Sequence, residues 1–191
     1  MGKFMDYFRD SFEYLTDTSD EPGISYYTEI FGDKKYSAED LSGIAIEEIS
    51  RMLAGKITER TNEECVRGMS VVGPHRDDYI FSLKKNTGGT EKRSFEIKNF
   101  ASQGEHKTFV IALKLAEYHF MKDVRGSLPV LLLDDLLSEL DSVRVSKIVS
   151  HLKDYGQIFL TTTDTSYLNE LKNFYAGKEI SLFKVVKGQV E

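Results

Sequence analysis

Two adjacent carboxylates, Asp134 and Asp135, directly follow an apolar run in the segment VLLLDDLLSELD at residues 130–141. A continuous apolar run predicts a strand that is buried on both faces of a sheet. Because charged carboxylates are costly to bury, we expect this acidic pair at the exposed carboxyl end of the strand, where open α/β sheets bind ligands. One carboxylate could hold Mg²⁺ while its neighbour orients or activates a water. A solvated turn is the alternative for an isolated Asp-Asp pair.

A second set of polar residues precedes the acidic pair in the chain. The segment ASQGE at residues 101–105 stands just before a long hydrophobic stretch that predicts a helix. Ser102 and Gly104, with Gln103 between them, would present a hydroxyl and free backbone N–H groups at the helix start. Such groups suit a phosphate. An ordinary helix N-cap is the alternative.

Two more polar stretches follow the acidic pair. The segment SELD at residues 138–141 comes just after it, and TTTD at residues 161–164 ends a second apolar run. Hydroxyl groups at the end of a strand could meet a phosphate or its bound water. Each of these stretches is unremarkable by itself.

Hydrophobic patterning predicts the elements that would position these residues. A 3.6-residue period predicts helices and a run of β-branched or aromatic residues predicts strands. The expected helices are residues 4–15, 41–52 behind a capping box at 37–40, 61–67, 104–124, 145–152 and 168–174. The expected strands are 24–31, a hairpin of 78–83 with 94–97, 130–133, 157–163 and 180–186. From residue 104 onward helices and strands alternate, which is typical of a largely parallel sheet.

Composition limits the class of protein. The chain has 191 residues, 40% of them hydrophobic, and a formal charge of −6, which argues against a general nucleic-acid or anionic-membrane surface. Its single cysteine, Cys65, excludes an intrachain disulfide and fits a reducing compartment. No apolar stretch approaches the roughly 18 residues of a membrane span. We therefore expect a soluble, cytoplasmic protein with no membrane contact.

In this order, the polar stretches resemble the second half of an ABC-type ATPase. Residues 101–105 are similar to its signature loop, 131–135 to its Walker B strand and 138–141 to its D-loop. The segment GPHRDD at 73–78 and the full run at 130–141 narrow the resemblance to the RecF family, bacterial recombinational repair proteins of the SMC-like ABC group.

The resemblance implies a fold class and a division of the chain. Residues 71–191 would form the C-terminal part of an ABC-type ATPase head, an α/β unit with a largely parallel sheet flanked by helices. Residues 1–70 would form a mostly helical lobe segment ahead of it. The roles of His75 and Arg76 are not assigned by the resemblance, and a salt bridge with the neighbouring aspartates is an alternative to a ligand contact.

The resemblance also implies roles at the acidic end of the strand. Asp134 would hold Mg²⁺, and Asp135 would take the place of the usual catalytic glutamate. Thr163 stands where most ABC ATPases carry a switch histidine, which implies slow hydrolysis.

The remaining implied roles concern a dimer. Ser102, Gln103 and Gly104 would reach the γ-phosphate of ATP held by a second protomer. Ser138 and Asp141 would communicate across the interface between the two protomers.

By the same resemblance, ATP-gated homodimerisation would clamp DNA at gaps and help to load recombinase together with the partner RecR. However, no GxxxxGK[ST] loop occurs in these 191 residues, so we expect no tight ATP binding by this chain alone. Missing sheet strands would leave an open edge or an apolar face. Two other functions stay open: a metal-dependent phosphohydrolase or nuclease, and a non-catalytic binding module of the same fold.

Overall fold

A computed structural model describes residues 2–32, 35–36, 40, 43–86, 92–135, 137, 140–163, 171–172, 175 and 180–190. The helices are α1 (Gly2–Thr16), η1 (Glu29–Phe31), α3 (Ile46–Arg67), α4 (Ile97–Phe100), α5 (Gln103–Arg125), α6 (Ser142–His151) and η2 (Leu152–Asp154). The strands are β1 (Glu21–Tyr27), β2 (Lys35–Tyr36), β3 (Asp78–Asn86), β4 (Lys92–Glu96), β5 (Leu131–Leu133), β6 (Ile158–Leu160), β7 (Val185–Val186) and β8 (Gln189–Val190). None of these helices combines the length and apolarity that a bilayer crossing requires.

The strands form three sheets. The largest is antiparallel with the order β2-β1-β3-β4, and it contains the predicted hairpin as β3 and β4. Strands β5 and β6 pair in parallel, and β7 and β8 form a short antiparallel hairpin. The mixed α/β fold class is confirmed, but parallel pairing within the described ranges is confined to β5 and β6.

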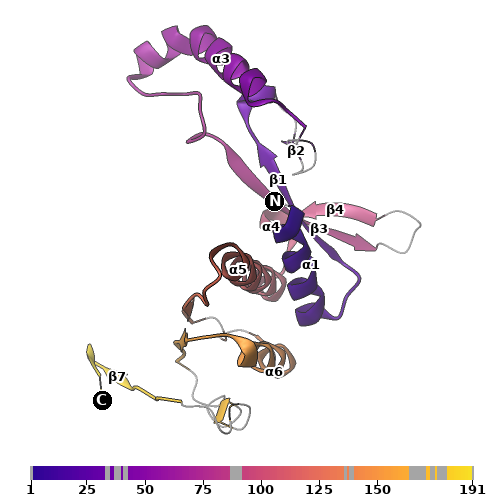
Figure 1. The fold of residues 1–191 in the computed structure, drawn as a ribbon, viewed down its shortest axis with the longest axis vertical. Helices are drawn as coiled ribbons and strands as arrows, with labels where there is room; N and C mark the ends of the chain where they lie inside the picture. The colour runs from indigo at the N-terminus through magenta and orange to yellow at the C-terminus, as the bar shows by residue number, and fades with distance from the viewer. Residues whose placement is uncertain are drawn as a thin grey trace.

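The core is built around α5, which lies side by side with α1, below the four-stranded sheet (the central sheet) and above α6 in Figure 1. Phe109 of α5 is 2% exposed, and its ring makes edge contacts with Phe8 and Phe12 of α1 and with Phe81 of β3. The predicted helix of residues 4–15 is thus confirmed together with its buried stripe. Since α1 and β1 pack on elements beyond residue 70, both parts of the predicted division share one core, and the division itself stays a prediction.

The prediction that the strand before the acidic pair is buried on both faces is wrong. Leu131 and Leu133 of β5 are buried, whereas Leu132 between them is 69% exposed and Phe159 of the neighbouring β6 is 52% exposed. Alternating residues of a strand point to opposite faces, so one face of this pair packs on the helices and the other is open. The expected apolar face is therefore present.

The predicted helices at 41–52 and 61–67 form one element, because α3 runs unbroken through Gly55 from Ile46 to Arg67. It starts at Ala45 with no side-chain cap, and the expected capping box at residues 37–40 lies mostly outside the described residues. No residue of α3 is buried, since the helix projects away from the core at the far end of the central sheet (Figure 1). Ion pairs one turn apart, such as Lys56 with Glu59, stabilise this exposed helix.

The last predicted strand, residues 180–186, is wrong for most of its length. Only Val185–Val186 is a strand, and it pairs with Gln189–Val190. Lys187 and Gly188 between them have φ of 50° and 80°, as a two-residue hairpin turn requires. The predicted strand at 24–31 shifts to Glu21–Tyr27, and the predicted helix at 168–174 lies mainly outside the described residues.

We expect Phe8→Ala to lower the free energy of unfolding by about 3–5 kcal/mol, because it leaves a cavity beside Phe109. Phe183→Ala is the matched control, since Phe183 is 71% exposed. Urea unfolding followed by circular dichroism measures both variants. Equal losses in the two variants would show that the aromatic packing does not hold the core.

Candidate active site

The acidic pair lies where the sequence places it, exposed at the carboxyl end of β5. Thr161 follows the end of β6, and its N–H donates to the Leu133 carbonyl over 3.0 Å, which aligns the two strand ends. The Thr161 Oγ1 hydroxyl donates to Asp134 Oδ1 at 2.6 Å and accepts from the Asp135 N–H at 2.9 Å. One threonine therefore fixes both aspartates.

The backbone of Asp135 lies in the left-handed region with φ of 45°. Aspartate adopts this region more readily than bulky residues do, and the hydrogen bond from its N–H to Thr161 supports the conformation. The chain therefore turns sharply between the two carboxylates, which directs them differently from consecutive residues of a straight strand.

Asp134 fits a magnesium ion of the kind that enzymes hold with one or two carboxylates, waters and substrate phosphates. It is exposed, and only one of its oxygens accepts the Thr161 hydroxyl in the contacts between described residues. No group of three His, Cys, Asp or Glu side chains in the described part of the chain could enclose a metal by itself.

The predicted signature loop forms the start of α5. Ser102 is the N-cap, with its Oγ accepting from the Glu105 N–H at 3.3 Å, and Glu105 Oε2 accepts from the Ser102 N–H at 2.9 Å. This reciprocal capping box is the ordinary helix N-cap that the sequence analysis gave as the alternative to a phosphate site. Gln103 is the first residue of the helix and is exposed.

Asp141, the last residue of the predicted D-loop, caps α6 in a similar way. Its Oδ1 accepts from the Arg144 N–H and its Oδ2 from Arg144 Nη1, both at 2.9 Å. These contacts, the backbone hydrogen bond foremost, lower the pKa of Asp141 below its ordinary value. Helix α6 therefore begins as the sequence predicts, with Asp141 as its cap.

Arg144 lies close to the predicted signature loop as well as to the predicted D-loop. Its Nη1 would lie 3.3 Å from a Cβ added to Gly104, which is a tight contact. The absence of a side chain at Gly104 thus allows the guanidinium to approach the first turn of α5. The structure joins two of the predicted stretches through this one side chain.

For the remaining residues that the sequence singled out, the structure gives no hydrogen bond or ion pair with the acidic pair among the residues that it describes. Thr163 is exposed at a bend beyond β6, and Ser138 lies outside the described residues. Arg76 donates to the Ser70 carbonyl at 3.1 and 3.2 Å, while Asp77 accepts from the Tyr26 hydroxyl. His75 Nε2 lies 3.3 Å from the same carbonyl, so His75 and Arg76 both contact the loop before β3.

The sequence pointed to Thr161 only as part of the stretch TTTD at residues 161–164, and it did not point to Lys85. Thr161 had a detectable signal, since it is the first polar residue after an apolar strand. Lys85 lies in β3, and no local pattern relates it to the signature loop. Its Nζ forms an ion pair with Glu105 Oε1, and this contact with Lys85, together with the Ser102 N–H, lowers the pKa of Glu105 to about 2.

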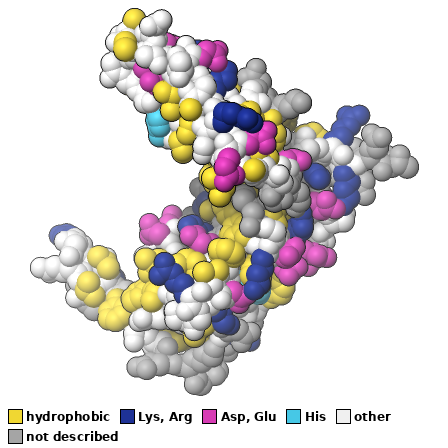
Figure 2. All heavy atoms as spheres, turned by 45° about the horizontal axis from the view of Figure 1, so that its top comes forward, with side chains coloured by type: hydrophobic (Ala, Val, Ile, Leu, Met, Phe, Trp, Pro, Cys, Tyr) yellow, Lys and Arg dark blue, Asp and Glu magenta, His cyan; other side chains and the backbone are white. Residues whose placement is uncertain are grey.

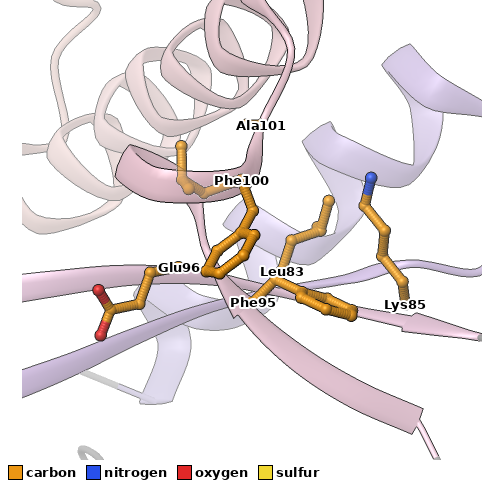
Figure 3. A pocket seen from close by; sticks show the side chains of 7 residues that line it. Leu83, Lys85, Phe95, Glu96, Phe100 and Ala101 are labelled. Atoms are coloured by element: carbon orange, nitrogen blue, oxygen red, sulfur yellow. The ribbon is translucent and has the colours of Figure 1, made fainter.

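An open hollow of about 230 Å³ lies beside the signature loop. Figure 3 shows its wall, which comes from β3, β4 and the segment leading into α5. Phe100, just ahead of Ala101 and Ser102, is 68% exposed, and its ring meets Phe95 edge-on at 5.8 Å. An apolar surface thus adjoins the predicted phosphate-contacting residues.

Sequence comparison relates the chain to DNA replication and repair proteins. RecF of Chloroherpeton thalassium is 34% identical over 180 residues, which cover 93% of this chain and 45% of that protein. RecF of Halothermothrix orenii is 39% identical over 145 residues, covering 76% of this chain and 35% of that protein. The chain is a relative of the C-terminal part of RecF proteins. It spans less than half the length of these curated relatives.

Solved structures share the fold of this chain. A solved structure of the recombination mediator protein RecF-ATPrS in the RecFOR pathway matches all of this chain, and 44% of its own chain, with a TM-score of 0.63 at 24% identity. A structure of RecF-ATP gives a TM-score of 0.62. At this identity the match shows that the fold is shared. No family model matches the chain.

We expect Thr161→Val to lower the free energy of unfolding by about 1 kcal/mol, because Asp134 and the Asp135 N–H lose their shared partner. Thr161→Ser is the matched control, since it keeps the hydroxyl. Urea unfolding measures both variants. A serine variant as unstable as the valine variant would show that the methyl group, rather than the hydrogen bonds, matters.

Glu105 should contribute to the acid sensitivity of the fold. Its pKa of about 2 is below the ordinary 4.5, so its stabilising contribution is present above pH 4.5 and is lost as the pH falls from 4.5 through 2. We expect the stability advantage of the wild type over Glu105→Gln to shrink across this window in urea unfolding. Glu117→Gln, which alters the exposed pair with Lys114 on α5, is the control. An advantage independent of pH would contradict the assignment.

Proposed function

We propose that this chain supplies the signature loop, acidic strand end and D-loop of a RecF-like ATPase that acts in DNA recombination, replication and repair. The observation that carries the proposal is the hydrogen-bonded junction of Asp134, Asp135 and Thr161 at the ends of two parallel strands. The relationship to RecF proteins supports it, since relatives of this chain are DNA replication and repair proteins and one solved structure is of RecF-ATP.

In this proposal the acidic pair performs the chemistry on ATP. Asp134 holds Mg²⁺, which neutralises the charge of the phosphates. Asp135 orients or activates the attacking water, with its position fixed through Thr161. Thr163 stands at the usual switch position, and a threonine there supplies no imidazole to a proton transfer.

The signature loop and the D-loop act across a homodimer. Ser102, Gln103 and Gly104 meet the γ-phosphate of ATP held by the second protomer, and Asp141 and Ser138 communicate across the interface between the two protomers. Arg144 lies between the two loops, so both can engage the second protomer as one unit. The phosphate-binding loop must come from sequence outside these 191 residues, because they contain no GxxxxGK[ST].

The proposed biological partners are DNA at gap junctions and RecR. Figure 2 shows Lys and Arg side chains interspersed with Asp and Glu on one face, so no basic patch marks a DNA-binding surface on that side.

A metal-dependent nuclease is not favoured. It needs additional carboxylates or histidines near the acidic pair, and no group of three such residues occurs among those that the structure describes. The relatives reported above are also RecF proteins. The alternative of a non-catalytic binding module applies to this chain by itself, without a phosphate-binding loop.

The test combines this chain with a polypeptide that carries the phosphate-binding loop, the remaining part of Chloroherpeton thalassium RecF, and measures MgATP hydrolysis. We expect Asp135→Asn to reduce hydrolysis by about a hundredfold or more while ATP-dependent dimerisation persists. Asp134→Asn should remove Mg²⁺ dependence together with hydrolysis.

Asp10→Asn is the control for the loss of one negative charge, because Asp10 is exposed on α1. Sedimentation velocity with and without ATP reports dimerisation separately from hydrolysis. Undiminished hydrolysis in Asp135→Asn would contradict the proposal. So would a Mg²⁺-dependent nuclease activity that Asp134→Asn abolishes.

A further inference from the structure

The carboxylate of Glu105 is held from two directions at the start of α5. Its Oε2 accepts from both the N–H and the Oγ of Ser102 at 2.9 Å. Its Oε1 accepts from Lys85 Nζ, which comes from β3. The Lys85 and Glu105 side chains are 33% and 32% exposed, so the ion pair is partly shielded from water. Each oxygen of the carboxylate thus has its own partner.

Lys85 reaches the signature loop from a different part of the fold. Figure 3 shows its side chain rising from β3 on the side where Phe100 and Ala101 lie. On the same strand, buried Leu83 anchors this region to the core. The central sheet is therefore linked electrostatically to the first turn of α5, across 20 residues of sequence.

This link matters for a phosphate that approaches Ser102. The Ser102 hydroxyl donates to Glu105 in the structure, and it would have to donate to a phosphate oxygen instead. An unpaired carboxylate at this position would repel the phosphate and compete for the same hydroxyl. Pairing with Lys85 cancels the charge of Glu105 and draws it toward Oε1, which is the oxygen remote from Ser102.

We propose that Lys85 is a positioning residue of the ATPase site: it neutralises Glu105 and so allows Ser102 to bind the γ-phosphate of ATP held by a second protomer. This inference rests on the proposed function. Lys85 acts through Glu105 and does not itself touch the nucleotide. The β3–β4 hairpin thereby becomes part of the phosphate-binding apparatus, although it contains none of the stretches that resemble ATPase motifs.

The charge role can be separated from the capping role. Glutamine at position 105 preserves a capping box, because Gln serves at this position as Glu does. Lys85→Met alone leaves a bare carboxylate next to Ser102, whereas Lys85→Met with Glu105→Gln leaves a neutral cap. If the site requires a neutral charge beside Ser102, adding Glu105→Gln should restore the ATP-dependent dimerisation that Lys85→Met weakens.

The experiment uses the assembled ATPase with the phosphate-binding loop present, and it measures the ATP concentration that gives half-maximal dimerisation by sedimentation velocity. We expect Lys85→Met to raise this concentration about five- to tenfold. The double variant Lys85→Met/Glu105→Gln should return to within about twofold of wild type. Lys84→Met is the matched control, because Lys84 is the neighbouring exposed residue of β3 and pairs in register with Ser94. Circular dichroism checks that every variant is folded.

Ser102→Ala distinguishes the proposed role of the signature loop from the proposed role of Lys85. If it leaves ATP-dependent dimerisation unchanged, the proposed role of the signature loop is overturned, and the role of Lys85 with it. If Ser102→Ala abolishes dimerisation while folded Lys85→Met behaves as wild type, only the role of Lys85 is overturned. A double variant that stays as impaired as Lys85→Met would also overturn it, since charge would not be the cause.

Discussion

Packing around the ring of Phe109 is the interaction on which the other features of the chain depend. The ring is enclosed by Phe8 and Phe12 of α1 and by Phe81 of β3, with centroid distances of 5.0, 6.0 and 5.8 Å. Edge-to-face contacts of this kind add to the burial of large apolar surfaces. They fix α5 relative to the central sheet, and thereby place the first turn of α5 within reach of Lys85.

The candidate site residues lie at the ends of regular elements. Asp134 and Thr161 follow β5 and β6, while Ser102 and Asp141 cap α5 and α6. Element ends carry backbone groups without internal partners, so polar side chains there serve the fold even in the absence of a ligand. At Ser102 the hydroxyl donates to Glu105, so a phosphate of the proposed nucleotide would have to take the place of that partner.

The open face of β5 and β6 fits a site that is composite. Leu132 and Phe159 expose apolar surface beside the acidic pair, and the chain matches 44% of a solved RecF chain. The chemistry proposed for Asp134 needs phosphates that another stretch of polypeptide would cradle. Exposed apolar surface of this kind favours contact with further polypeptide.

The sequence by itself determined the features that depend on neighbours in the chain. The period of α5, the caps Ser102 and Asp141, and the place of the acidic pair behind an apolar strand all follow from local patterns, because periodicity and capping are local effects. The antiparallel pairing of β1 with β3 and the solvent exposure of α3 had no such signal.

Only the tertiary structure decided the contacts between distant segments. Thr161 meets Asp134, Lys85 meets Glu105, and Arg144 approaches Gly104 because packing brings their elements together. The exposure of Leu132 also depends on the tertiary structure, since a run of leucines predicts a strand but not whether both of its faces are covered. Local sequence thus fixed which residues could do chemistry, and packing fixed which of them act on one another.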